Sequence, residues 1–224
     1  MTTEHRWYPV CRTQELVAGH VAQSQILGHE LAVWRDHIGQ VHVWENRCPH
    51  RGVRLSIGLN LGESLQCRYH GWKFATGTGQ CIHIPAHPDQ TPAENLQVTR
   101  FRGAEKYGLI WTFVPLKDSI PQMPELPLAD GITLRSHILQ AGLSEVLDAL
   151  GKIAQPIDAW IWRDHDQHIP IHYLLQPMDQ RFVAIHSLWG GYLTHKDWIE
   201  ISRRENARLT LAFRSIDVRS GITP

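Results

Sequence analysis

The sequence predicts a mainly β amino-terminal domain, folded as a small antiparallel sandwich, followed by a short α+β segment. Short apolar runs separated by turn residues fill the chain as far as residue 114, and helical periodicity starts only beyond residue 140. A proline-rich stretch lies between them, and 224 residues are enough to bury a core in each part. We therefore expect a domain at 1–115, a connector at 116–128 and a carboxyl-terminal segment at 129–224.

The strands of the first domain are indicated by alternating apolar residues between turns. Trp34, Trp44 and Trp111 occupy alternating strand positions, so we expect them in the core or on a sheet face. Two further residues, Cys11 and Cys81, are expected to be small buried side chains rather than a disulfide. The expected strands cover residues 7–10, 31–35, 41–44 and 108–114, and the expected hairpin turns cover residues 37–40 and 77–80.

The second segment mixes helical and strand patterns. Apolar residues recur at helical spacing from Leu143 to Ala154, and Pro156 is expected to stop that helix. Two strand-like runs, 169–175 and 181–188, are joined by a predicted hairpin. A capping pattern of Thr194 with Asp197 predicts a further helix beyond them. These patterns together predict an α+β segment.

The composition is that of an ordinary globular protein. Hydrophobic residues make up 42% of the chain and charged residues 20%, and 22 Lys and Arg balance 22 Asp and Glu. This balance gives no net charge that would attract nucleic acid or an anionic membrane. The amino terminus has no apolar leader and no run of 18 apolar residues occurs, so we expect a soluble, cytoplasmic protein.

Two pairs of metal-binding residues stand out in the first domain. Cys48 and His50 form a Cys-x-His pair, and Cys67 and His70 form a Cys-x-x-His pair sixteen residues later. Two thiolates and two imidazoles suit either a tetrahedral zinc site or a [2Fe-2S] cluster with two Cys on one iron and two His on the other. Zinc fingers usually pair Cys with Cys and His with His. The mixed pairs therefore favour the cluster, with structural zinc as the alternative.

The residues around the two pairs extend the pattern. Cys-Pro-His-Arg-Gly at 48–52 and Cys-Arg-Tyr-His-Gly-Trp-Lys-Phe at 67–74, with Gly-Gln-Cys at 79–81 and Ile-Pro at 84–85, resemble the Rieske domain of the Rieske non-haem iron oxygenases. Respiratory and photosynthetic Rieske proteins carry an additional Cys in each loop. Here Val53 and Tyr69 stand at those places, so the chain resembles the oxygenase and ferredoxin branch.

This resemblance has several implications. It implies a sandwich fold with the cluster at the tip of two loops, held by the four residues above. It also implies an O₂-dependent mono- or dioxygenase component that hydroxylates or demethylates a small, often aromatic, molecule within a homo-trimer or hetero-oligomer. The chain has no Gly-x-Gly-x-x-Gly element after a strand. Its electrons are therefore expected from a separate NAD(P)H-dependent reductase or a ferredoxin.

A second, mononuclear iron is not supported by the spacing. Members of the family hold that iron with two His from an Asp-x-x-His-x-x-x-x-His pattern and a later carboxylate, and this pattern is absent. The nearest stretch, 164–168, is followed by His172 four residues after His168, with a proline between them. We interpret it as a polar turn with surface histidines, and assign no role to Asp148 or Asp217. The catalytic residues thus stay unknown, and the alternative is a Rieske electron-transfer or accessory protein without its own mononuclear Fe(II).

Other residues near the metal pairs have two interpretations. Arg47, Arg51, Arg54 and Arg68 either bind loop carbonyls or form a cationic docking face for an acidic reductase or ferredoxin. Trp72 follows the second pair directly, where its indole could shield a cluster from water and so influence its potential.

Overall fold

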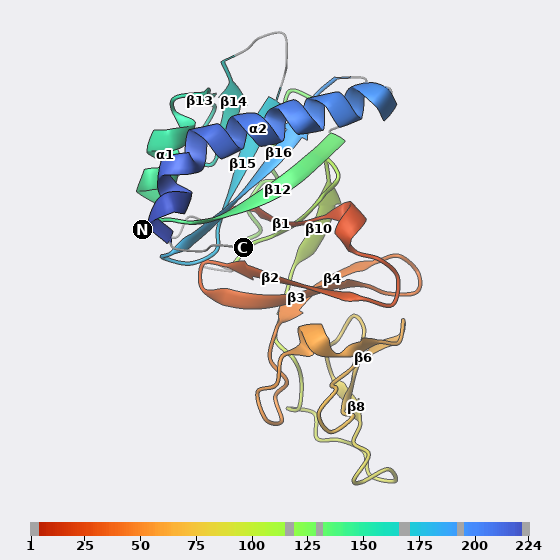
Figure 1. Cartoon of the computed structure of the whole chain (residues 1–224). Coiled ribbons are helices and arrows are strands. Elements are labelled where there is room, and N and C mark those ends of the chain that lie inside the picture. The colour runs from red at the N-terminus through yellow and green to blue at the C-terminus, as the bar shows by residue number, and fades with distance from the viewer. Residues whose placement is uncertain (1–4, 115–118, 129–131, 166–170, 192–194, 221–224) are drawn as a thin grey trace. The chain divides into compact units, whose positions relative to one another are not determined.

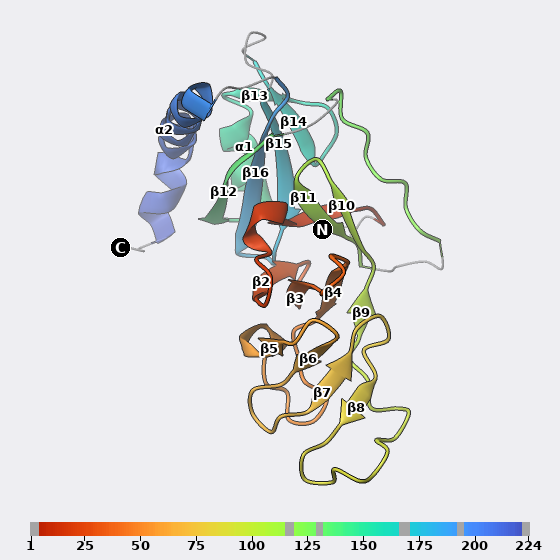
Figure 2. The same cartoon turned by 90° about the vertical axis from the view of Figure 1, so that its right-hand side faces the viewer.

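The computed structural model describes residues 5–114, 119–128, 132–165, 171–191 and 195–220. The chain forms two compact units, Met1–Met123 and Pro124–Pro224, and their boundary falls inside the stretch proposed as a connector. All strand pairings within the named sheets are antiparallel in the described residues (Figures 1 and 2). The mainly β fold predicted from the sequence is therefore confirmed.

The described residues of the first unit form three sheets, with strand orders β1-β11-β10, β2-β3-β4-β9 and β5-β6-β7-β8. Two short 3₁₀ turns, η1 (Thr13–Glu15) and η2 (Leu55–Ile57), connect strands of different sheets. The strands are β1 (Tyr8–Arg12), β2 (Val21–Ile26), β3 (His29–Arg35), β4 (Val41–Glu45), β5 (Leu59–Asn60), β6 (Ser64–Gln66), β7 (Lys73–Ala75), β8 (Cys81–His83), β9 (Arg100–Phe101), β10 (Gly103–Lys106) and β11 (Leu109–Thr112).

The β3–β4 hairpin forms where the sequence predicts it. The carboxylate of Asp36 accepts hydrogen bonds from the amides of Ile38 (3.1 Å) and Gln40 (2.8 Å), and Gly39 supplies the positive φ of +86°. Strand β2, which pairs with β3 along its whole length, was not predicted. Its sequence shows no alternation because three consecutive polar residues, 23–25, fill half of its positions.

An aromatic core lies beneath the β5–β8 sheet. Trp34 and Trp44 are fully buried and meet edge to face, with ring centroids 5.1 Å apart, and Phe74 packs in the same cluster. Trp111 is buried as well, so the predicted placement of the tryptophans is confirmed. The same core contains Cys81. This packing holds β6 and β7, between which the second metal-binding pair lies, against β3 and β4.

The second unit is one five-stranded sheet with two helices in its described part. Its strand order is β12-β16-β15-β14-β13, and α2 runs along one face of the sheet (Figure 1). The elements are β12 (Ile132–Gln140), α1 (Leu143–Leu150), β13 (Ala154–Pro156), β14 (Ile161–Asp164), β15 (Ile171–Pro177), β16 (Phe182–Trp189) and α2 (His195–Ser220).

Several predictions for this unit hold and one needs correction. The β15–β16 hairpin is confirmed, as is a helix beyond Thr194, a residue that lies outside the described ones. Helix α1, however, ends at Leu150 and not near Pro156, because Gly151 occupies its carboxyl cap and Ala154 already pairs in β13. Apolar spacing alone did not reveal this change from helix to strand.

Helix α2 is fixed to the sheet by buried polar contacts as well as apolar packing. The guanidinium of Arg208 donates to both carboxylate oxygens of the fully buried Asp164 on β14. One turn away on the helix, Glu205 bonds to the hydroxyl of Tyr173 on β15, and burial raises the pKa of the Glu205 carboxyl. These polar side chains of α2 therefore find their hydrogen-bond partners on the sheet of the same unit.

Among the helices described, none is long and apolar enough to cross a membrane.

Candidate metal centre

The first metal loop, residues 48–53, is a tight turn closed by two backbone hydrogen bonds. The amide of Cys48 donates to the carbonyl of Val53 (2.9 Å), and the amide of Gly52 donates back to the carbonyl of Cys48 (2.9 Å). Gly52 has φ of +73°, a conformation that glycine adopts without a steric penalty. The turn therefore leaves His50 half-buried while its first residue, Cys48, is buried.

The second metal loop, residues 67–72, repeats this arrangement. The amide of Cys67 donates to the carbonyl of Trp72 (2.8 Å), and the amide of Gly71 donates to the carbonyl of Cys67 (3.0 Å). Gly71 also has φ of +73°, and a Cβ there would lie 2.9 Å from Cγ of Pro85. The two loops therefore have the same backbone hydrogen bonds and the same glycine conformation, although one carries a Cys-x-His pair and the other a Cys-x-x-His pair.

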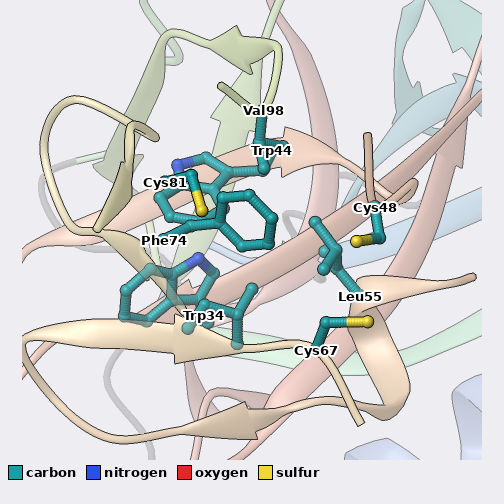
Figure 3. Packing of buried hydrophobic residues seen from close by; sticks show 10 residues of the cluster. Trp34, Trp44, Cys48, Leu55, Cys67, Phe74, Cys81 and Val98 are labelled. Carbon is teal, nitrogen blue, oxygen red and sulfur yellow. The ribbon is translucent and has the colours of Figure 1, made fainter. Parts of the chain in front are cut away.

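The two cysteines lie at one side of the aromatic core. Cys48 and Cys67 flank Leu55 there, and neither forms a disulfide (Figure 3). Burial raises the pKa of the Cys48 thiol to about 11, and the neighbouring Cys67 sulfur adds to this shift. Backbone amides of His50 and Arg51 donate to the Cys48 sulfur and act in the opposite direction. The two buried thiols, with amide donors at the Cys48 sulfur, are suited to being held as thiolates by a metal, which replaces the protons.

The two histidines meet at the outer end of the loops. Nδ1 of His50 and Nδ1 of His70 lie 3.1 Å apart. Two nitrogens bound to one ion at about 2.0–2.1 Å each would be separated by about 3 Å, so the rings are placed to share a metal through these atoms. Desolvation, the His70 ring and Arg51 lower the pKa of His50, which favours the neutral form that can act as a ligand.

The arrangement distinguishes between zinc and a two-iron cluster. Among the residues that the structure describes, no three His, Cys, Asp or Glu side chains converge on a point where one metal ion could bind. The four candidates instead form a Cys–Cys pair on the buried side and a His–His pair on the exposed side. This is the donor set of a cluster with two Cys on one iron and two His on the other.

An aromatic side chain stacks on each of the two histidine rings. The indole of Trp72 stacks on the His50 ring, with centroids 4.4 Å apart and planes 6° from parallel. Tyr69 stacks on His70 at 3.8 Å with a larger tilt of 29°, and it is 59% exposed. The sequence suggested shielding by Trp72. It gave no sign that Tyr69 would cover the other histidine, because stacking depends on the loop geometry.

The four arginines near the loops differ in their roles. Arg54 forms a bidentate ion pair with Glu30 (2.6 and 2.9 Å), which ties the first loop to β3. The exposed side chains of Arg47, Arg51 and Arg68 make no hydrogen bond or ion pair within the described part of the chain. Arg47 lies over Gly52 at the edge of a hollow of about 430 Å³. One arginine is therefore structural and three remain available to a partner.

Comparison with known families agrees with this geometry. Residues 6–102 match the model of the Rieske [2Fe-2S] domain. This part of the chain is similar to a Rieske [2Fe-2S] domain. The cofactor implied by the Rieske domain is a [2Fe-2S] cluster, and the donor set found at the two loops fits it.

Curated relatives confirm the resemblance to the Rieske oxygenases. The chain is 40% identical over 150 residues to oxidoreductase NdmD of Pseudomonas putida, covering 65% of this chain and 26% of that protein. It is 34% identical over 137 residues to methylxanthine N1-demethylase NdmA of the same species, covering 58% and 38%. The chain thus spans about a quarter to two fifths of the length of these relatives.

Solved structures extend the likeness in fold to both units. NdmA of Pseudomonas putida CBB5 gives a TM-score of 0.72 at 20% identity, covering 98% of this chain and 82% of that one. The oxygenase of carbazole 1,9a-dioxygenase, solved in complex with its ferredoxin, gives a TM-score of 0.70 at 14% identity, covering 96% and 79%. At these identities the match shows the fold alone.

Those residues considered for a second iron that the structure describes do not form a group that could hold a metal ion. Asp148 is exposed on α1, and His172 is buried within β15. Asp164 is bound by Arg208, and His165 is exposed. His168 and the side chain of Asp217 lie outside the described residues. The interpretation of His172 as a surface residue is wrong, because β15 is covered on both faces.

Proposed function

We propose that this chain is a one-electron relay of a Rieske oxygenase system. Cys48 and Cys67 would hold one iron of the [2Fe-2S] cluster, and His50 and His70 would hold the other. The observation that supports this most directly is the facing pair of Nδ1 atoms, 3.1 Å apart, on the side of the loops away from the cysteine pair.

The cluster supplies reversible one-electron chemistry at a potential within the range of about −150 to +300 mV for Rieske centres. The protein contributes orientation, hydrogen bonds and shielding. Amides of the first loop donate to the Cys48 sulfur and stabilise its negative charge. Trp72 holds the plane of the His50 ring and keeps water from one of its faces.

The electrons are proposed to come from a separate protein, an NAD(P)H-dependent reductase or a ferredoxin. Uncommitted arginines beside the histidines support an acidic partner. A solved oxygenase of similar fold was crystallised with its ferredoxin, which supports the same kind of partner. We place this exchange in the cytoplasm.

The wider activity is proposed from the relatives. They include a methylxanthine demethylase and the oxygenase subunit of 3-chlorobenzoate-3,4-dioxygenase, so the system is proposed to hydroxylate or demethylate an aromatic small molecule with O₂. The chain would act there as part of a homo-trimer or hetero-oligomer. Its own mononuclear iron is not part of this proposal.

A second candidate is an electron-transfer or accessory protein that performs no oxygen chemistry itself. The observation that favours it is the use of Asp164 as a partner of Arg208 and the exposure of Asp148, so that neither supplies a carboxylate beside His172. The match to NdmD, named an oxidoreductase and not an oxygenase, agrees with this candidate.

Metal and sulfide analysis separates these two candidates, which both predict a cluster alone, from a chain that holds a mononuclear iron of its own. Protein purified without oxygen should contain two irons and two acid-labile sulfides per chain and give an EPR signal on reduction. Two irons favour the relay, whereas three irons with two sulfides would establish a mononuclear site. Zinc without sulfide would overturn the proposal. If a third iron is found, His168→Ala combined with His172→Ala should remove it and spare the cluster signal.

A further inference from the structure

The bases of the two metal loops are closed in different ways. The second loop is the tip of the β6–β7 hairpin, and Gln66 pairs with Lys73 across its base. The first loop connects β4 to η2, which is a 3₁₀ turn, so no strand pairing continues across its base. Backbone pairing therefore positions the second loop, and other contacts must position the first.

Asn46 and Ser56 close the base of the first loop with two side-chain hydrogen bonds. The side-chain nitrogen of Asn46 donates to Oγ of Ser56 (3.0 Å), and its side-chain oxygen accepts from the Ser56 amide (2.7 Å). Asn46 is only 2% exposed, and its backbone amide donates to the carbonyl of Glu30 on β3 (2.9 Å). Because Asn46 directly follows β4 and Ser56 lies in η2, this pair joins the segments that enter and leave the loop. We call it the Asn46–Ser56 clamp.

The hydrogen bonds inside the first loop set its shape but not its position. The amide of Cys48 bonds to Val53, and the amide of Gly52 bonds to Cys48. Both bonds lie within the loop and would survive a tilt of the whole loop. The clamp resists such a tilt because it fixes both ends of the loop to each other.

The position of the first loop decides how the two histidines meet. His50 is on this loop and His70 is on the other, and their Nδ1 atoms lie 3.1 Å apart. Leu55, the residue before Ser56, is fully buried in the core that also contains Cys67 (Figure 3). The clamp is therefore anchored beside the second metal-binding pair, and its loss would let His50 move relative to His70.

We propose that Asn46 is a positioning residue for the cluster, an inference that rests on the proposed function. Acting through Ser56, it keeps His50 at the distance from His70 that allows both rings to bind one iron. Its side-chain oxygen and nitrogen are both bonded to Ser56, so it is not itself a ligand. Groups that orient metal ligands in this way change metal affinity about 10–100-fold when they are removed.

Release of the cluster from the holoprotein tests this role. Bleaching of the visible absorption by excess iron chelator, without oxygen, gives the release rate, and the reduced EPR signal reports the geometry at the irons. Asn46→Leu removes both hydrogen bonds at similar volume, so it should raise the release rate about tenfold and broaden the EPR signal. Ser56→Ala removes one bond and should raise the rate by a smaller factor. Ser56→Thr keeps the hydroxyl and should keep the wild-type rate.

Asn60 supplies a matched control in the same unit. It is also buried, and its side chain donates to the carbonyls of His20 and Arg35 and accepts from the Gly62 amide. These bonds connect β5 to neighbouring segments near the β5–β6 turn, at the end of β6 away from the second metal loop. Asn60→Leu should therefore lower the free energy of unfolding in urea and leave the release rate and the EPR signal unchanged.

Three results would decide against these proposals. Equal acceleration of release in Asn60→Leu and Asn46→Leu would show that the release rate follows general stability, and would overturn the positioning role. So would a wild-type release rate in Asn46→Leu or, if that variant does not fold, in Ser56→Ala. Absence of iron, sulfide and the EPR signal in the wild type would instead refute the proposed function, because there would be no cluster to position.

Discussion

The two metal loops share one backbone frame but differ in how side chains support it. Each is closed by the same pair of backbone hydrogen bonds, and each has a glycine at φ of +73°. His50 is the third residue of its loop and His70 the fourth, so facing turns of equal shape bring the rings together. The first loop is tied by an ion pair, and the second is packed against Pro85. The backbone conformation of the loops therefore sets the position of the ligands. The surrounding side chains determine how well each loop tolerates a substitution.

The largest expected effect is loss of the cluster when a proposed cysteine ligand is replaced. Replacing a cysteine of the same core that is not a proposed ligand is the control. Cys67→Ser should abolish the visible absorption and the reduced EPR signal, because a serine hydroxyl is a poor replacement for the thiolate. Cys81→Ser changes a side chain that is equally buried in the same core but is not a proposed ligand. It should retain the cluster with some loss of stability. Retention of both signals in Cys67→Ser would show that the proposed ligand set is wrong.

The next prediction compares the two glycines. Alanine at φ of +73° costs about 1–2 kcal/mol in either loop. At Gly52 the added Cβ would meet the movable Arg47 side chain at 3.3 Å, whereas at Gly71 it would lie 2.9 Å from the Pro85 ring. Overpacking should therefore add about 1–3 kcal/mol for Gly71→Ala alone. In urea unfolding, Gly71→Ala should have a lower free energy of unfolding than Gly52→Ala. Equal losses of stability would show that Pro85 does not restrain the second loop.

The sequence predicted the ligand residues of these loops but not their surroundings. Spacing and residue type are local, so Cys48, His50, Cys67 and His70 could be proposed directly. The stacking of Tyr69 on His70, and the pairing of Arg54 with Glu30, join groups whose relation depends on the folded loops. No periodicity in the chain encodes such contacts.

The same limit explains the errors in the second unit. The helix that begins at Leu143 was extended too far because Ile153 and Ala154 continue its apolar spacing, although Ala154 pairs in β13. His172 was expected at the surface because polar residues precede it, but tertiary packing buries its strand. Pairing with other strands decided both cases, and a local pattern does not report such pairing.

A smaller effect, on the midpoint potential of the cluster, should distinguish Trp72 from Tyr69, the two aromatic residues that stack on the histidines. Reduction adds one negative charge to the cluster, and water stabilises that charge better than an indole does. Trp72→Ala should therefore raise the midpoint potential, on the order of tens of mV, where 59 mV corresponds to a tenfold change for one electron. Tyr69→Ala should have less effect because Tyr69 is already 59% exposed. Protein-film voltammetry measures both, and a larger shift for Tyr69→Ala would reverse the proposed asymmetry.

The smallest predicted effect concerns the ion pair that ties the first loop alone. The hydrogen bond from Arg54 lowers the pKa of the Glu30 carboxyl, and this outweighs partial desolvation. A carboxyl with a lowered pKa stabilises the fold above its ordinary value of 4.5, and this contribution disappears as pH falls through the lowered pKa. Glu30→Gln should therefore lower the urea midpoint slightly near pH 7, and the difference from wild type should vanish in acid. Because both side chains are exposed, the effect should also fade in high salt. An NMR titration in which Arg54→Gln leaves the pKa of Glu30 unchanged would show that this pair does not hold the first loop.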